Sequence, residues 1–300
     1  MFADMDPRVT EAAADVLGTG VNSVESRPGG SINHAWRLTL EDGSSVFLKG
    51  RAGAEKAEFE MEAAGLAWLA AADALPLPEV LGTVGGPMPG LLLEWIEPGG
   101  RLDAAGEETF GRGLASIHRH GADGYGRLPD DAPALELHVG PVGLGTCFDE
   151  DPERGFGPCY GQRIEGLAAR ALDRGAIDRD QMAAIGSVCA RIEHLAGPAE
   201  PPARTHGDLW SGNVLVAADG VPWLIDPAAH GAHRELDLAM LWLFGAPSDR
   251  FMAAYKEEFP LEPEYRQRID LWQIQPLLIH AILFGGPYGT AAARAAAVYS

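Results

Sequence analysis

Residues 205–213 read THGDLWSGN, and this short stretch decides how the rest of the chain is interpreted. Its reactive side chains are His206, Asp208 and Asn213. A carboxylate such as that of Asp208 can accept the proton of an attacking hydroxyl group. An amide five residues later can turn back and hold a metal ion near that carboxylate, if the stretch forms a short loop. As isolated residues the same three would make a turn with polar caps, so neighbouring sequence has to separate the two interpretations.

The sequence that follows predicts a hairpin ending in a second carboxylate. Residues 213–216 and 221–225 have strand character, and Asp219-Gly220 is typical of the turn between them. Such a hairpin would bring Asp226 back beside Asn213. Carboxylate and amide oxygens suit Mg²⁺, which also takes phosphate oxygens and water. The alternative is that Asp226 is a turn residue closing an apolar strand.

A third feature is a lysine on an early strand. Lys49, Lys56 and Lys256 are the lysines of the chain, and Lys49 ends the apolar run 45–49. A glycine turn at residues 28–31 precedes the partner strand, 35–40. Backbone N–H groups of such a turn and an ammonium on the next strand can meet the same phosphates. The alternative is a lysine whose ammonium reaches solvent at a strand end.

The order of predicted elements indicates two lobes. In residues 1–96 a short helix (7–17) is followed by strands and by one Ala- and Glu-rich helix (54–72), with further strands at 79–84 and 90–96. Residues 97–300 are mainly helical, with helices expected at 103–118, 164–174, 180–196 and from 235 onward. We therefore predict an α+β fold with an N-terminal nucleotide-binding lobe, 1–96, and a catalytic and substrate-binding lobe, 97–300. Residues 138–161 are rich in Gly and Pro and support no firm prediction.

Composition excludes several classes of partner. The 300 residues carry 23 Lys and Arg against 43 Asp and Glu, a net charge of −20, which argues against a nucleic acid or anionic membrane held by a general basic field. The apolar runs 238–246 and 276–285 are shorter than the roughly 20 residues that span a bilayer. The first residues lack the apolar core of a signal peptide. These features predict a cytoplasmic protein without nucleic-acid or membrane partners.

The cysteines are Cys147, Cys159 and Cys189, an odd number without a C-x-x-C pair. This pattern favours reduced thiols over a disulfide framework or a zinc site.

These motifs together resemble a known fold. His206, Asp208 and Asn213 match the kinase catalytic-loop pattern H-R-D-x-x-x-x-N, with Gly207 in place of the arginine. Lobe order, the strand lysine and the Ile-Asp after a hairpin are similar to the protein-kinase-like fold of aminoglycoside and choline phosphotransferases. A more specific resemblance is to the fructosamine kinase (ketosamine-3-kinase) family. It covers most of the chain outside 125–165 and is carried by GGSINHAWRLTLEDGSSVFLK, HGDLWSGN, IDPAAHGAHRELDLAML and FMAAYKEEF…RIDLWQIQPLLIHAILFGGPYG.

The resemblance implies a role for each matching residue. Asp208 would be the general base, with Asn213 and Asp226 as metal ligands. The nucleotide would be bound by the glycine turn, the strand lysine with its glutamate partner, and the backbone at the hinge: Gly29, Gly30, Ser31, Lys49, Glu62, Glu94, Trp95 and Ile96. Glu58 and Glu60 are lower-ranked alternatives to Glu62. His206 and Asp237 would support the catalytic loop, while Trp210 and Arg234 would bind substrate, unless Trp210 only packs and Arg234 only pairs with neighbouring glutamates.

The implied activity is transfer of a phosphoryl group from ATP, with Mg²⁺, to the O3 hydroxyl of a ketosamine, free or protein-bound. This is deglycation chemistry, because the 3-phosphate breaks down and frees the amine. The family usually has Asn-x-Ile-Gly where this chain has residues 137–140, LHVG, which leaves the acceptor in doubt. Two alternatives stay open: a kinase for an aminoglycoside- or choline-type acceptor, and a nucleotide-binding pseudokinase that serves as an interaction module. Ser31 stands where some relatives carry a cysteine, so we expect a monomer without a redox disulfide dimer.

Overall fold

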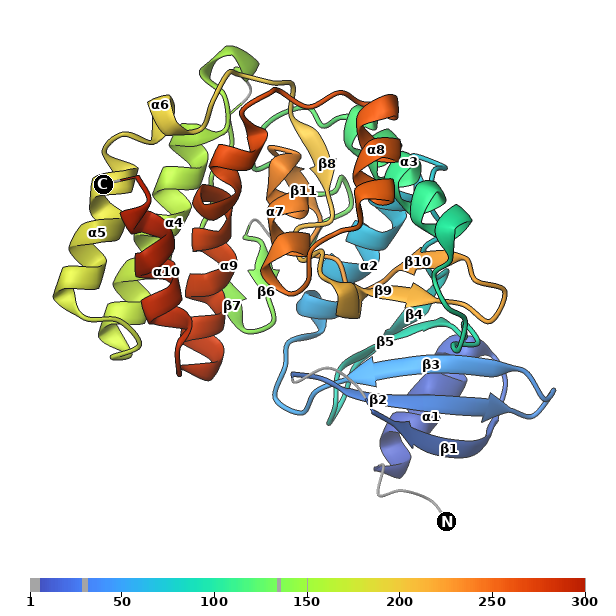
Figure 1. Ribbon diagram of the computed structural model, residues 1–300. Coiled ribbons are helices and arrows are strands. Elements are labelled where there is room, and N and C mark those ends of the chain that lie inside the picture. The colour runs from blue at the N-terminus through green and yellow to red at the C-terminus, as the bar shows by residue number, and fades with distance from the viewer. Residues whose placement is uncertain (1–5, 29–31, 134–135, 150, 300) are drawn as a thin grey trace.

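A computed structural model describes residues 6–28, 32–133, 136–149 and 151–299, which form a small sheet lobe beside a larger helical lobe (Figure 1). This arrangement confirms the predicted α+β fold of two lobes. The division at residue 96 stays a prediction.

The sheet lobe is built on five antiparallel strands in the order β1-β2-β3-β5-β4. They are β1 (Val21–Arg27), β2 (His34–Leu40), β3 (Ser45–Gly50), β4 (Val80–Val84) and β5 (Gly90–Glu94). Helix α1 (Pro7–Leu17) covers one face and α2 (Lys56–Ala70) the other. Successive side chains of β5 point to opposite faces of the sheet. Leu92 packs in the cluster with α1, whereas Leu91 and Leu93 pack in the cluster with α2.

The helical lobe contains the remaining helices and several short two-stranded ladders. The helices are α3 (Ala104–His120), α4 (Gly157–Asp173), α5 (Arg179–Cys189), α6 (Ile192–Leu195), α7 (Glu235–Leu243), α8 (Asp249–Glu258), α9 (Ile269–Phe284) and α10 (Tyr288–Ala297). The ladders pair β6 (His138–Val139) with β7 (Val142–Gly143), β8 (Ala203–Thr205) with β11 (His230–Ala232), and β9 (Val214–Val216) with β10 (Pro222–Leu224). The β9–β10 hairpin was predicted from sequence and is confirmed.

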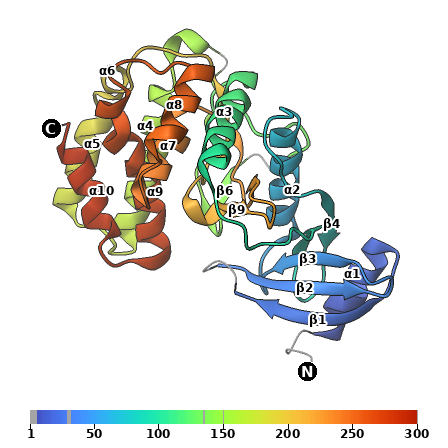
Figure 2. The same cartoon turned by 45° about the vertical axis from the view of Figure 1, so that its right-hand side comes forward.

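Helix α2 belongs to both lobes. It packs on the sheet through Phe59 and Leu66, and its C-terminal end places Trp68 and Leu69 in the core of the helical lobe with residues of α3, α7 and α8. Figure 2 shows α2 reaching from the sheet toward α3. Gly65 allows this approach, because a Cβ there would lie 3.2 Å from the Cβ of Ala229.

Three predicted boundaries shift. The helix expected at 180–196 is two helices, α5 and α6, and α5 begins where Asp178 and Gln181 form a capping box. The helix expected at 164–174 begins earlier, at Gly157, with Pro158 in its first turn. The strand expected to end at residue 96 ends at Glu94.

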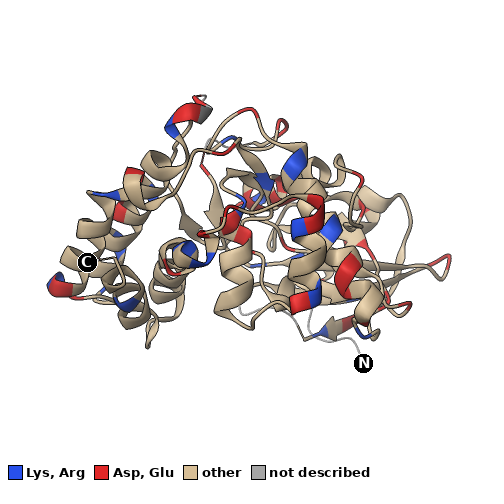
Figure 3. Ribbon diagram, turned by 45° about the horizontal axis from the view of Figure 1, so that its top comes forward, with Lys and Arg blue, Asp and Glu red and all other residues tan. Residues whose placement is uncertain are grey.

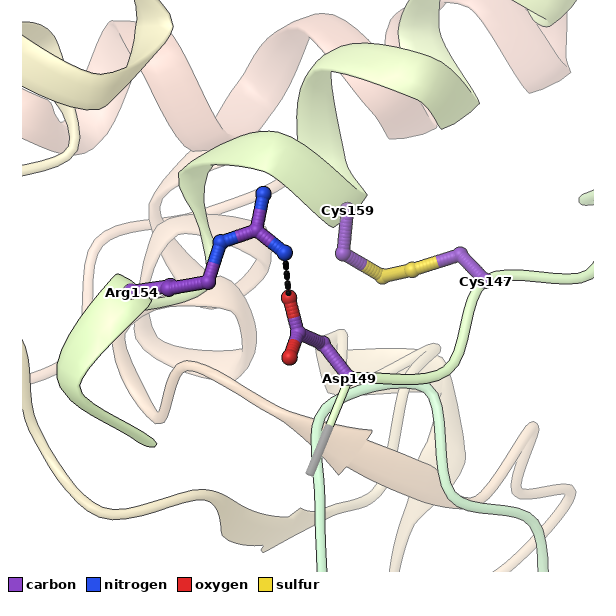
Figure 4. Close-up of a disulfide and its surroundings, with 4 residues drawn as sticks. All are labelled: Cys147, Asp149, Arg154 and Cys159. Carbon is purple, nitrogen blue, oxygen red and sulfur yellow. Dashed lines mark hydrogen bonds and ion pairs between the residues drawn. A yellow bond between two sulfur atoms is a disulfide. The ribbon is translucent and has the colours of Figure 1, made fainter. Parts of the chain in front are cut away.

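The prediction of reduced thiols is wrong for two of the three cysteines. Cys147 and Cys159 form a disulfide whose Cα atoms are 5.5 Å apart, while Cys189 is free (Figure 4). The segment after β7 runs back along the start of α4, and an ion pair of 2.9 Å between Arg154 and Asp149 closes the same loop. The two cysteines are 12 positions apart in the chain, and nothing in that spacing indicated the pairing.

Figure 3, a ribbon coloured by residue type, shows basic and acidic residues interspersed along the chain in both lobes. Among the helices that the structure describes, none combines the length and apolarity needed to cross a membrane.

Candidate active site

Lys49 lies at the centre of the site, on β3 and buried. Its ammonium nitrogen is 2.7 Å from Glu62 Oε2 on α2 and 3.0 Å from Asp226 Oδ1 after β10. The prediction that Glu62 pairs with this lysine is confirmed. The other candidates are engaged elsewhere, since Glu58 binds Arg51 and Glu60 binds Lys56.

One ammonium between two carboxylates leaves an excess of negative charge. Burial and the nearby Asp226 carboxylate raise the pKa of Glu62 to about 7, although the Lys49 charge opposes this. Burial acts against the charge of Lys49, but Asp226 and Glu62 outweigh it and hold the lysine pKa above its usual value. The site therefore favours an additional cation.

Asp208 lies on the loop between β8 and β9, close to Asn213. The Asn213 amide nitrogen donates to the backbone oxygen of Asp208 at 2.8 Å and to its Oδ2 at 3.2 Å. Burial raises the pKa of Asp208 to about 7, and the carboxylates of Asp226 and Asp237 act in the same direction. A carboxyl group with that pKa is a stronger base at neutral pH than an ordinary aspartate.

Asn213 and Asp226 fit the hard-cation ligands that the sequence predicts. The amide nitrogen of Asn213 bonds Asp208, so the amide oxygen of Asn213 is not used in that contact. The Ile225 N–H donates to the Asn213 backbone oxygen at 3.1 Å, which holds Asn213 beside the residue that precedes Asp226. Asp226 has φ of +56°, an uncommon conformation for a residue with a side chain and one that concentrates at functional sites. Within the described residues no group of three or more His, Cys, Asp or Glu side chains could hold a metal. Mg²⁺ needs fewer protein ligands, because phosphate and water complete its shell.

Asp237 and His206 hold the loop in place. Asp237 is buried in the first turn of α7 and accepts hydrogen bonds from the backbone N–H of His206 at 2.6 Å and of Gly207 at 2.8 Å. His206 Nε2 donates to the backbone oxygen of Ile225 at 2.9 Å. This imidazole thus joins the loop that carries Asp208 to the strand end that carries Asp226.

Two residues that hydrogen-bond behind Asp237 were not predicted from the sequence. His118 on α3 donates from Nε2 to Asp237 Oδ2 at 3.1 Å, and the Tyr255 hydroxyl on α8 bonds His118 Nδ1 at 2.7 Å. No motif marks these residues. Only the three-dimensional packing of α3, α7 and α8 brings them together.

Gly207 occupies a position that no other residue fits. Its φ is +81°, and a Cβ there would lie 2.1 Å from the backbone oxygen of Ala228. We expect Gly207→Ala to lower the free energy of unfolding by about 3 kcal/mol, because strain and a backbone clash combine. Urea unfolding measures this. Gly186→Ala is the control: Gly186 lies inside α5 with nothing within 4 Å of the added methyl, and that variant should be slightly more stable. Equal effects of the two substitutions would contradict the prediction.

The hinge residues lie at the end of β5. Glu94 pairs with Val46 in the sheet and its N–H donates to Glu79, so this N–H is not available to a base. The Trp95 ring is covered by Arg37 at 4.6 Å and Arg27 at 5.2 Å. If an adenine binds here, its partners come from the remaining backbone groups of Glu94, Trp95 and Ile96.

The predicted glycine turn, Gly29, Gly30 and Ser31, lies outside the described residues. The next residue, Ile32, is described and faces Gly140, since a Cβ on Gly140 would lie 2.7 Å from its Cδ1. The β6–β7 hairpin therefore lies beside the chain that leaves the glycine turn.

Two residues were predicted to bind substrate, and the structure separates them. Trp210 is 37% exposed, and its ring stands edge-on to Phe244 with 5.6 Å between centroids. Arg234 is not brought to the site. It is buried, and Glu200 accepts from its Nε at 2.6 Å and from its Nη2 at 2.7 Å. Of the two roles left open for Arg234, the structure shows the pairing with a glutamate, and the glutamate is Glu200 instead of a residue next to it in the sequence.

A narrow cavity opens beside Asp208. It is lined by apolar side chains of β6, α7 and α9, together with Gly207, Asp208, Gln275 and His280. Asp208 is the one carboxylate among the described residues that line it. The cavity thus offers an enclosed space next to the proposed base.

Comparison with known proteins agrees with this geometry. The sequence profile of the fructosamine kinase family matches residues 5–137 and 156–298. The chain belongs to this family. The "probable ketoamine kinase" of Enterococcus faecium is 32% identical over 87% of this chain and 90% of its own. The chloroplastic protein-ribulosamine 3-kinase of Oryza sativa subsp. indica is 29% identical over 95% of this chain and 79% of its own.

Solved structures extend the comparison. A "putative fructosamine-3-kinase" from Thermobifida fusca has a TM-score of 0.86 and 37% identity, covering 98% of this chain and 99% of its own. The amicoumacin kinase hAmiN, in complex with AMP-PNP, Ca²⁺ and Ami, has a TM-score of 0.60 at 15% identity, covers 98% of this chain and 92% of its own, and shares the fold alone. This protein is accordingly a kinase with the protein-kinase-like fold, and its family transfers phosphoryl groups to sugar hydroxyls.

Proposed function

We propose that this protein transfers the γ-phosphoryl group of ATP to the O3 hydroxyl of a ketosamine, a sugar joined to an amine. The observation that carries the proposal is the pairing of Lys49 with Glu62 and Asp226, opposite a loop on which Asp208 borders a closed cavity. The relatives named for ketoamines and ribulosamines support the choice of acceptor.

The proposed mechanism follows from the residues. Lys49 binds the α- and β-phosphates, and Asn213 and Asp226 hold Mg²⁺, which would neutralise charge on the phosphates. Asp208 accepts the proton of the acceptor hydroxyl as the bond from that oxygen to the γ-phosphorus forms and the bond from this phosphorus to the β–γ bridging oxygen breaks. Phosphoryl transfer passes through a loose transition state, so orientation and charge neutralisation supply most of the rate acceleration.

The alternatives are less well supported. An aminoglycoside acceptor is polycationic, whereas the relatives that match most of this chain are named for ketoamines and ribulosamines. A pseudokinase usually lacks one of the catalytic side chains, yet Lys49, Asp208, Asn213 and Asp226 are all present.

An ATP-consumption screen against ribulosamine, fructosamine, an aminoglycoside and choline tests the proposal, with product NMR to locate the phosphate. We expect turnover with a ketosamine and a phosphate on O3. Turnover confined to the aminoglycoside or to choline, or no turnover at all, would contradict it.

Trp210 provides a local test of the acceptor. The ring is partly exposed, two residues from Asp208, and could stack on an apolar sugar face. We expect Trp210→Ala to raise the KM for the ketosamine about fivefold, corresponding to about 1 kcal/mol, with little change in the KM for ATP. Trp223→Ala on the β9–β10 hairpin is the control and should leave the acceptor KM unchanged. An unchanged acceptor KM with a lowered melting temperature for Trp210→Ala would mean that the ring only packs.

A further inference from the structure

Gln275 is a polar side chain for which the fold provides no visible purpose. It lies on α9, an otherwise strongly apolar helix, and only 2% of it is exposed. Within the described part of the chain its Oε1 has no hydrogen-bond partner. A buried acceptor without a partner destabilises the folded chain, so such a group points to a ligand that completes it.

The helix is altered at this same residue. The Tyr160 hydroxyl, on α4, lies between two successive turns of α9: it accepts from the Gln275 N–H at 3.1 Å and donates to the Leu271 oxygen at 2.6 Å. The next residue, Pro276, has no N–H to donate. Inserted side chains and prolines are the recognised causes of local bending in helices. The regular hydrogen bonding of α9 is therefore interrupted at Gln275, and the same residue lines the cavity beside Asp208.

The cavity that Gln275 lines is the one that contains Asp208. Its volume of about 10 Å³ has room for roughly one water-sized group, so a hydroxyl that reached into it past Asp208 would come close to α9. His280, also in the lining, donates from Nδ1 to the Pro276 oxygen at 2.8 Å, which leaves Nε2 as an acceptor. The Gln275 amide oxygen, His280 Nε2 and the Asp208 carboxylate are thus acceptors at this cavity, and they match a ligand that presents hydroxyl donors.

We propose that Gln275 is a specificity-determining residue, whose amide oxygen accepts a hydrogen bond from a second hydroxyl of the sugar acceptor. This inference rests on the proposed function, because it concerns the acceptor of that reaction. A water molecule would occupy the position in the resting enzyme and be displaced by a hydroxyl that reproduces its hydrogen bond. An analogue without that hydroxyl would leave Oε1 unpaired and bind more weakly.

The test uses Gln275→Met, which keeps the length of the side chain and removes the acceptor. We expect kcat/KM for the ketosamine to fall about tenfold and the KM for ATP to stay unchanged. The melting temperature should stay the same or rise, since a buried polar atom without a protein partner has been removed.

Gln273→Met is the matched control, two residues earlier on the same helix. Gln273 is also buried, but its Nε2 donates to the Ala239 oxygen at 2.9 Å. Its loss should lower the melting temperature and leave acceptor kinetics unchanged. Gln275→Met is therefore expected to impair acceptor kinetics without loss of stability, and Gln273→Met to lose stability without a change in acceptor kinetics.

A series of deoxy-ketosamines tests the inference on the wild-type enzyme itself, and the same series can then be applied to the variant. One deletion other than at the reacting hydroxyl should cost about tenfold in kcat/KM, and the same deletion should cost nothing further in Gln275→Met. Equal sensitivity of both enzymes to every deletion, or unchanged acceptor kinetics in Gln275→Met, would overturn the inference. So would tolerance of every such deletion by the wild type, whether or not the variant folds. A wild type without turnover on any ketosamine would instead refute the proposed function.

Discussion

Asp208→Asn is expected to lower kcat for phosphoryl transfer by about 1,000-fold while nucleotide affinity stays within about twofold. The substitution keeps an oxygen that can accept from the Asn213 amide, so the loop should hold its shape. It removes the group whose raised pKa suits it to take the hydroxyl proton. Nucleotide contacts through Lys49 lie on the other lobe and are untouched.

Single-turnover kinetics and nucleotide titration separate these effects. Asp180→Asn, at the exposed start of α5, is the control and should retain full activity. Residual turnover of Asp208→Asn within tenfold of the wild type would remove Asp208 as the general base.

Lys49→Ala is expected to weaken ATP binding about 100-fold and adenosine binding hardly at all. In the proposed mechanism the ammonium binds phosphates and not the adenine base, so a ligand without phosphates would not use it. The substitution also leaves Glu62 and Asp226 without their shared cation, and the melting temperature should fall.

The double variant Lys49→Met/Glu62→Gln removes the charge of Glu62, the more buried of the two carboxylates, and distinguishes binding from stability. It should recover the melting temperature but not the affinity for ATP. Lys56→Ala, at the exposed start of α2, is the control for a lysine of the same lobe. Equal losses for ATP and adenosine in Lys49→Ala would mean that Lys49 is structural.

Much of the site could be predicted because it is encoded locally. The residues of 205–213 follow one another on a single loop, and the hairpin that returns Asp226 has an Asp-Gly turn between two short strands. The Lys49–Glu62 pair was identified by the resemblance, since periodicity alone did not separate Glu62 from Glu58 and Glu60. Glu58 pairs with Arg51 and Glu60 pairs with Lys56, and the sequence alone did not indicate these pairings.

The remaining features depend on contacts between distant segments. The partner of Arg234 was not predicted, because Glu200 lies 34 residues earlier in irregular chain. The Cys147–Cys159 bridge and the Tyr160 hydroxyl inside α9 likewise join segments whose mutual position only the folded helices define. Gln275 could not be singled out, because a glutamine in an apolar helix gives no sign of whether a protein group satisfies it.

The anchoring of α2 in both lobes has a consequence for control of the enzyme. In many kinases the helix that carries the lysine-pairing glutamate swings outward to switch activity off. Here such a swing would have to extract Trp68 and Leu69 from the helical core and break the stacking of Arg204 on Trp68 at 4.6 Å. With α2 in this position the Lys49–Glu62 pair is formed, so the helix need not move to assemble it. This anchoring is therefore expected to keep the pair assembled, and any control that acts by moving α2 would first have to unpack the helical lobe.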